Sequence, residues 1–157
     1  MGPGKKFYED HLAYLGRGDI DGLLSEHYHE DAQMVTFEFV LKGREAIGKY
    51  LKEDAPQVTG QILGLSTDYF AESDDVIIYK ASVQTEKFGI VKGDDAFYLK
   101  DGKISRHIAL TIPPEKTREW AFKDVTPMPP PKGPLKPGRK FYEDHLAYLG
   151  RGDIDGL

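Results

Sequence analysis

The chain has 157 residues, of which 39% are hydrophobic and 30% charged, a composition typical of a folded globular protein rather than a disordered or fibrous one. It has no cysteine, which excludes disulfides, thiolate metal sites and cysteine nucleophiles. The net charge is −5 without a basic stripe, and neither a signal peptide nor an apolar run long enough to span a membrane is present. We therefore expect a cytoplasmic protein with no cofactor, no nucleic-acid partner and no membrane contact.

The chain opens with helical spacing. Residues 7–15 place Phe7, His11, Leu12 and Leu15 on one side of an amphipathic helix that Gly16 ends. Asp19 is a suitable N-cap for a second short helix, which runs to Tyr28. Two helices are thus predicted before the first strand.

The next stretch combines strand and helix patterns. After a turn at 29–31, residues 32–41 are rich in β-branched and aromatic side chains and predict a strand. Residues 44–54 return to helical spacing, and Pro56 is expected to end this third helix.

Beyond Pro56 the pattern becomes that of a β-sheet. Four strand-like runs, separated by short polar turns, cover residues 58–70, 76–85, 88–100 and 103–112. Asp101-Gly102 joins the last two, and this dipeptide favours a tight hairpin because both residues tolerate positive φ. The sequence predicts an α+β fold in which three helices cover one face of a bent antiparallel sheet.

The C-terminal part has a different composition. Trp120 is expected to hold the segment after the last strand against the domain. Residues 124–137 contain six prolines and predict an extended linker. Residues 138–157 then repeat residues 4–23 with 19 of 20 positions identical.

Several short motifs in this order resemble the nuclear-transport-factor-2-like superfamily, especially its SnoaL-like polyketide-cyclase and ketosteroid-isomerase-like branch. They are Phe7-Tyr8, Gly18 to Leu24, Tyr28 to Ala32, Lys42 to Ile47 and Lys100 to Ile104. The resemblance covers residues 4–112 and assigns residues 4–123 to one domain. It implies a cone-shaped α+β fold whose curved sheet and helices enclose an apolar pocket, commonly in homodimers packed through the sheets.

The resemblance also allows a residue-by-residue test of isomerase activity. The position of the isomerase base falls on Thr36, which cannot abstract a proton near neutral pH. The position of the first oxyanion donor falls on His11, and that of the second on Asp94 or Asp95. The ketosteroid-isomerase catalytic set is therefore not retained, and whether the chain is an enzyme stays open.

Other side chains offer acid–base candidates, each with a structural alternative. Glu38 would share a strand face with Thr36 and could serve as a base, or it could be solvated at the strand end. His11 could act in the pocket or be a buried core histidine. His107 could point into the cone or away from it. His27 and His29 stand near acidic residues, but their spacing suits a metal site poorly at a helix-to-turn junction, and no metal is predicted.

The predicted pocket would accept an apolar, polyketide-like or steroid-like small molecule. Its predicted lining, most of which could instead fill the core, is Tyr14, Met34, Thr36, Tyr50, Tyr79, Phe97 and His107.

The repeat is too well preserved for a natural internal repeat and stops within the second helix, so it indicates an engineered chain. It permits two complete element orders, the ordinary one at 4–123 and a circularly permuted one at 24–157. Because only one copy of the first helix can lie on a given sheet, the copies would compete or exchange between molecules as a domain-swapped oligomer. Alternatively, the second copy would be disordered and exposed to solvent.

Overall fold

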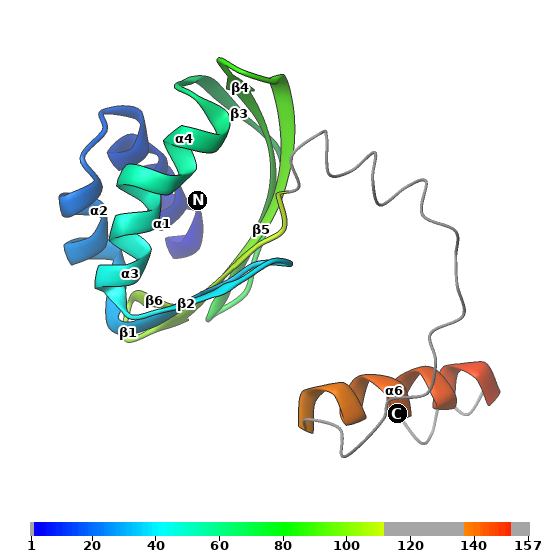
Figure 1. Ribbon diagram of the computed structural model, residues 1–157. Helices are drawn as coiled ribbons and strands as arrows, with labels where there is room; N and C mark the ends of the chain where they lie inside the picture. The colour runs from blue at the N-terminus through cyan, green and yellow to red at the C-terminus, as the bar shows by residue number, and fades with distance from the viewer. Residues whose placement is uncertain (1, 112–136, 152–157) are drawn as a thin grey trace. The chain divides into compact units, whose positions relative to one another are not determined.

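The computed structural model describes residues 2–111 and 137–151 of the chain (Figure 1). The chain divides into two compact units, one ending at Phe122 and the other beginning at Lys123. Trp120 and the predicted linker at 124–137 lie outside the described residues, except for Pro137, which is the first residue of a helix. Within the described ranges, no helix has the length and apolar character required to cross a membrane.

The first unit begins with the two predicted helices. Helix α1 (Pro3–Gly16) starts with a proline in its first turn, where the missing N–H has no intrahelical partner to lose. Helix α2 (Ile20–His27) is capped as predicted, because the Asp19 carboxylate accepts a hydrogen bond from the Gly22 amide at 2.9 Å. A short turn at Arg17–Asp19 therefore fixes α1 against α2.

The strand predicted over 32–41 is in fact two strands. Strand β1 (Tyr28–Val35) begins directly after α2, and β2 (Val40–Lys42) folds back beside it in antiparallel pairing. Between them Thr36 Oγ1 accepts hydrogen bonds from the amides of Glu38 and Phe39, which closes the turn. The predictions of a turn at 29–31 and of one continuous strand were wrong, because pairing with the sheet overrides local composition.

The third predicted helix runs further than expected. Helix α3 (Arg44–Lys49) continues through a π-helical turn, η1 (Tyr50–Asp54), into α4 (Ala55–Thr59). Pro56 lies in the first turn of α4 instead of ending the helix. The helix continues through Pro56 because the Ala55 amide bonds to the Tyr50 carbonyl, five residues earlier. The backbone hydrogen bonds have therefore already changed from the α-helical to the π-helical pattern before the proline.

The predicted antiparallel meander is confirmed. It consists of β3 (Ile62–Glu72), β4 (Val76–Thr85), β5 (Gly89–Lys100) and β6 (Lys103–Ala109). The Asp101-Gly102 hairpin has φ of 51° and 74° at its two residues, as such a turn requires. Strand β1 joins parallel to β6, which gives one six-stranded sheet in the order β2-β1-β6-β5-β4-β3.

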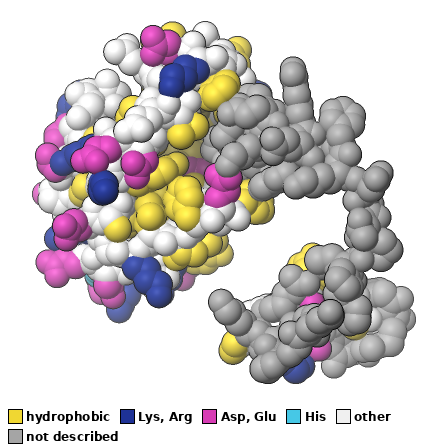
Figure 2. Space-filling model, viewed as in Figure 1, with side chains coloured by type: hydrophobic (Ala, Val, Ile, Leu, Met, Phe, Trp, Pro, Cys, Tyr) yellow, Lys and Arg dark blue, Asp and Glu magenta, His cyan; other side chains and the backbone are white. Residues whose placement is uncertain are grey.

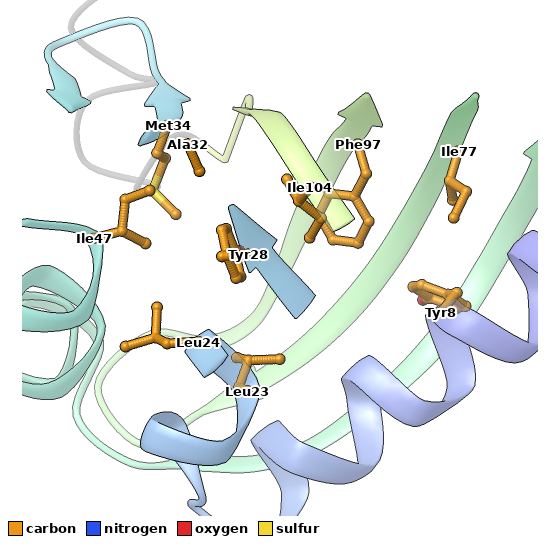
Figure 3. Close-up of a cluster of buried hydrophobic side chains, with 10 residues drawn as sticks. All are labelled: Tyr8, Leu23, Leu24, Tyr28, Ala32, Met34, Ile47, Ile77, Phe97 and Ile104. Carbon is orange, nitrogen blue, oxygen red and sulfur yellow. The ribbon is translucent and has the colours of Figure 1, made fainter. Parts of the chain in front are cut away.

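The sheet is curved and unclosed, and the helices of the first unit lie against its concave face (Figure 1). Figure 3 shows the core between these layers, to which α1, α2, α3 and four strands all contribute. Its members are Tyr8, Leu23, Leu24, Tyr28, Ala32, Met34, Ile47, Ile77, Phe97 and Ile104. Burial of each large side chain of this kind contributes about 1.5–3 kcal/mol, so the apolar sequence pattern directly produces the predicted α+β layering.

The second unit contains helix α6 (Pro137–Arg151), whose sequence repeats that of α1. Like α1 it begins at a proline followed by glycine. Two of its aromatic residues, Phe141 and Tyr142, are exposed.

Candidate active site

A cavity of about 320 Å³ lies between the concave face of the sheet and the helices. Small residues create the space on the sheet side: Ala81 and Gly93 are cross-strand neighbours on β4 and β5, and Ala109 pairs with Asp95. At the other end of the same strands the larger core residues fill the concave face. The distribution of residue size along the strands thus locates the cavity.

Helices α1 and α4 and the π-helical turn supply the opposite wall, with His11, Tyr50 and Val58 among its residues. Apolar side chains surround the opening, and Phe37 and Ile62 are exposed there. Figure 2 shows hydrophobic side chains gathered on the face that lies between helices and sheet. The lining is predominantly apolar, which suits an apolar ligand body.

Four polar side chains form a hydrogen-bonded cluster in this apolar surrounding. The Asp95 carboxylate and the His107 ring are joined by a 3.1 Å contact between Oδ2 and Nε2. Tyr79 donates its hydroxyl proton to the same Oδ2 at 3.0 Å, and the Tyr28 hydroxyl lies 2.8 Å from His107 Nδ1. All four residues line the cavity, and three of them come from adjacent strands β4, β5 and β6.

A β-bulge determines which way His107 points. Leu99 pairs with Ile104, but Tyr98 pairs with Arg106, so Ser105 is an extra residue in β6. The bulge shifts the alternation by one position and turns His107 to the concave face, opposite Phe97. Without it, a regular hairpin would place Arg106 on this face.

The hydrogen bonds define the protonation of the cluster. Burial, reinforced by the Asp95 charge, raises the pKa of Tyr28 and of Tyr79 well above the ordinary phenol value, so both hydroxyls remain protonated. In the neutral form of His107, the tautomer that fits these contacts carries its proton on Nε2, which donates to the Asp95 carboxylate, while Nδ1 accepts from the Tyr28 hydroxyl. Both His107 nitrogens are therefore engaged, whereas Asp95 Oδ1 has no hydrogen-bond partner among the described residues.

His11 contributes a second imidazole from α1. Its ring lies 4.8 Å from that of Phe97 and 6.0 Å from that of Tyr28, between centroids. Burial, together with the nearby His107 and His27, lowers the pKa of His11 well below the ordinary imidazole value. His11 is therefore neutral at pH 7, and within the described structure its Nδ1 has no hydrogen-bond partner.

Asp94 and Asp95 are consecutive residues of β5, so their side chains point to opposite faces of the sheet. Asp94 points to the other face of the sheet, where it forms an ion pair with Lys80 at 3.2 Å. Of the two residues left open by the resemblance, Asp95 alone lines the cavity. Glu38 lies exposed in the turn at the cavity opening, and its charge adds to the effect of burial in raising the pKa of Tyr50.

The remaining predicted pocket residues fall into two groups. Met34 and Thr36 line the cavity, and the Thr36 hydroxyl donates to the Phe39 carbonyl. Phe97 lies in the core below His107, and Tyr14 lies at a separate cleft between α1 and α2, stacked under Arg17.

The described residues include no group of three or more side chains able to hold a metal ion. His29 instead contacts the Lys100 carbonyl through Nε2 at 2.7 Å, and His27 packs on Phe7. Tyr28 was not among the predicted site residues, because the sequence pattern placed it at the end of a helix. The parallel pairing of β1 with β6 brings it to His107.

No family model and no curated protein matches the chain. Solved structures do match. A putative SnoaL-like polyketide cyclase from Shewanella putrefaciens is 13% identical over 78% of this chain and 88% of its own, with a TM-score of 0.63. TerC, co-crystallised with polyporic acid, is 22% identical over 76% and 96%, with a TM-score of 0.60. An NTF2-like protein of unknown function from Burkholderia pseudomallei is 15% identical over 75% and 97%, with a TM-score of 0.61. The chain has the nuclear-transport-factor-2-like fold.

Proposed function

We propose that the first unit binds an apolar small molecule bearing a hydroxyl or an acidic C–H, and that it transfers a proton from this group to Asp95. The observation that carries the proposal is the cluster of Asp95, His107, Tyr28 and Tyr79 in an otherwise apolar cavity. A carboxylate held in such surroundings is a common general base.

Asp95 is the proton acceptor in this proposal because its buried Oδ1 has no hydrogen-bond partner in the part of the chain that the structure describes. His107 and Tyr79 both donate to Oδ2, so they orient the carboxylate and stabilise its charge. The Tyr28 hydroxyl in turn holds the other ring nitrogen of His107, Nδ1, at 2.8 Å. His107 and the tyrosines are therefore positioning residues, and Asp95 is the catalytic residue.

The ligand class follows from the cavity and from the solved structures that share the fold. A volume of about 320 Å³ accommodates a compact polycyclic or aromatic molecule. The polyketide-cyclase neighbour and the polyporic acid complex of TerC support a polyketide-like or other aromatic ligand. A steroid-like isomerase substrate is less well supported, because Thr36 occupies the position of the isomerase base and its hydroxyl is used in the turn.

The test is a binding titration by calorimetry with a neutral polycyclic phenol, 2-naphthol, and with polyporic acid in parallel. We expect wild-type protein to bind 2-naphthol and Asp95→Asn to bind it about 10- to 100-fold more weakly, since a charge-assisted hydrogen bond is worth about 1.5–3 kcal/mol.

Asp94→Asn is the matched control, because this neighbouring carboxylate lies on the opposite face of β5. It should leave the affinity unchanged. Equal binding by wild type and Asp95→Asn, or equal weakening by both variants, would remove Asp95 from the mechanism. The rate of solvent deuterium incorporation at the acidic C–H of a bound ligand then separates proton transfer from binding alone.

A second candidate function belongs to the repeat. We propose that the chain is engineered, with two copies of the first helix that compete for one place, so that 4–123 and 24–157 are alternative orders of one domain. The observation that favours this is the identity of 19 of 20 residues between 4–23 and 138–157, which gives α6 the same side chains that α1 buries. Refolding at increasing protein concentration should populate domain-swapped oligomers, seen as larger masses in light scattering. A mass that stays constant with concentration contradicts the swap.

A further inference from the structure

We propose that α6 of an intact chain docks into the α1 groove of a second copy of this chain whenever that groove is vacant. The α1 groove is the part of the concave sheet face formed by Thr67, Phe70, Ile77, Tyr79 and Phe97, on which α1 lies. In the docked state His145 of one molecule takes the place of His11 at the cavity of the other. The inference deepens the proposed competition between the helix copies and rests on it.

Tyr8 provides the main contact of α1 with the groove. Its side chain is fully buried, and its ring centroid lies 5.3 Å from that of Phe70 and 4.6 Å from that of Tyr79. Its hydroxyl lies 2.8 Å from Thr67 Oγ1. A partner for this groove must therefore present a tyrosine at the same point of a helix, with a polar end that reaches Thr67.

The first turn of the helix adds a second requirement. The Lys5 amide donates to Glu72 Oε2 at 2.7 Å. A Cβ atom on Gly4 would lie 2.4 Å from that same oxygen and 3.2 Å from Ile77 Cγ1. The Glu72 carboxylate could move aside, but the approach to Ile77 leaves little room for a side chain at this position, and the repeat retains a glycine there, Gly138.

Helix α6 meets both requirements. It places Tyr142 and His145 at the helix positions of Tyr8 and His11. The centroid distance between Phe141 and His145 is 6.1 Å, against 6.5 Å between Phe7 and His11, so the local arrangement of this face is preserved.

Only one residue differs between the copies, and it keeps its charge. Lys5 lies over the ring of Phe70, with its Nζ 4.7 Å from the centroid. The repeat has Arg139 at this position, and guanidinium groups also favour aromatic faces. The substitution is therefore compatible with the groove.

The number of grooves and helix copies in each chain identifies the binding partner of α6. Each molecule has one groove and two helices that fit it. The turn at Arg17–Asp19 joins α1 directly to α2, which keeps α1 at a high effective concentration beside its own groove. When α1 occupies the groove of its own chain, α6 has no groove left in that chain. It can then bind the α1 groove of a second molecule whose own α1 cannot dock.

The experiment uses full-length chains. The recipient carries Tyr8→Asp together with Tyr142→Asp, which disables both of its helices and leaves its groove intact. The donor is wild type, and the control donor is Tyr142→Asp, which lacks only a competent α6. Donor and recipient are unfolded together, refolded, and measured by size exclusion with light scattering. We expect a species with the mass of two chains from the wild-type donor and none from the control donor.

A second recipient, with the less disruptive substitutions Tyr8→Ser and Tyr142→Ser, is tested in the same way. It keeps the experiment decisive if the Tyr8→Asp, Tyr142→Asp recipient refolds in low yield. Absence of the two-chain species with both recipients overturns the proposal, as does an equal yield with the control donor. The Tyr8→Asp single variant tests separately whether α6 can replace α1 within one chain. If that variant folds as a monomer while both recipients stay uncomplexed, competition within the chain stands and docking between copies is wrong.

Discussion

Helices α1 and α6 share a sequence but differ in burial. Tyr8 in α1 is 0% exposed, whereas Tyr142 at the same place in α6 is 53% exposed. Leu12 packs against the core, and its counterpart Leu146 is 45% exposed. The helical conformation is therefore encoded locally, while the burial of its apolar face depends on contact with the sheet.

This difference separates two sources of helix stability. The proline in the first turn and the spaced side chains are present in both copies. Burial of Tyr8 adds about 1.5–3 kcal/mol of apolar transfer and further aromatic contacts, which α6 lacks in its exposed state. A helix of this length without such packing is marginally stable in water.

The largest expected effect comes from disabling both copies. Tyr8→Asp with Tyr142→Asp places a carboxylate in the core position and leaves no competent replacement, so we expect a loss of at least about 4 kcal/mol in the free energy of unfolding. Tyr142→Asp alone should change it by less than about 0.5 kcal/mol, because Tyr142 is exposed. Tyr8→Asp alone should lie between, because α6 can substitute. Urea denaturation of the four proteins measures this, and additive losses would contradict substitution.

The next effect is a pH dependence that belongs to His11. Its pKa is lowered in the folded protein, so the unfolded chain binds the proton more readily, and stability falls as pH drops below about 6.5. We expect the wild type to lose about 1–2 kcal/mol more than His11→Gln between pH 7 and pH 5, measured by urea denaturation.

His145→Gln is the matched control for this change, and it should preserve the wild-type pH profile. His27, whose pKa burial also lowers, remains in all three proteins and adds the same slope to each. If His11→Gln and His145→Gln have identical profiles, His11 is not the group responsible.

The smallest effect concerns ion pairs on the exposed helix surface. Lys6 pairs with Asp10 in α1, and Lys140 pairs with Asp144 in α6. Because these pairs are solvent-exposed and local, Asp10→Asn and Asp144→Asn should each leave the thermal midpoint of the domain unchanged. A clear drop for Asp10→Asn alone would show that this pair contributes to docking on the sheet.

The sequence pattern was sufficient for the α+β class, the helical segments and the antiparallel meander, because apolar spacing and turn residues are local signals. The Asp101-Gly102 hairpin is the clearest case. The π-helical turn before Pro56 and the division into β1 and β2 were not predictable, since both depend on tertiary pairing.

The candidate site was predictable only in part, for a related reason. Asp95 was one of two alternatives, and the face of His107 was open because the extra residue Ser105 shifts the strand alternation. A single residue of register thus decides whether a histidine reaches the cavity. No local signal in the sequence marks such a bulge, or the pairing that brings Tyr28 to His107.

Amide hydrogen exchange of the wild-type protein, measured by NMR with residues 5–16 and 139–150 assigned separately, tests most directly whether the sheet determines the state of each helix. We expect strong protection for the amides of α1 and rapid exchange for those of α6, near that of an isolated helix. Equal protection of the two helices, or stronger protection of α6, would contradict it.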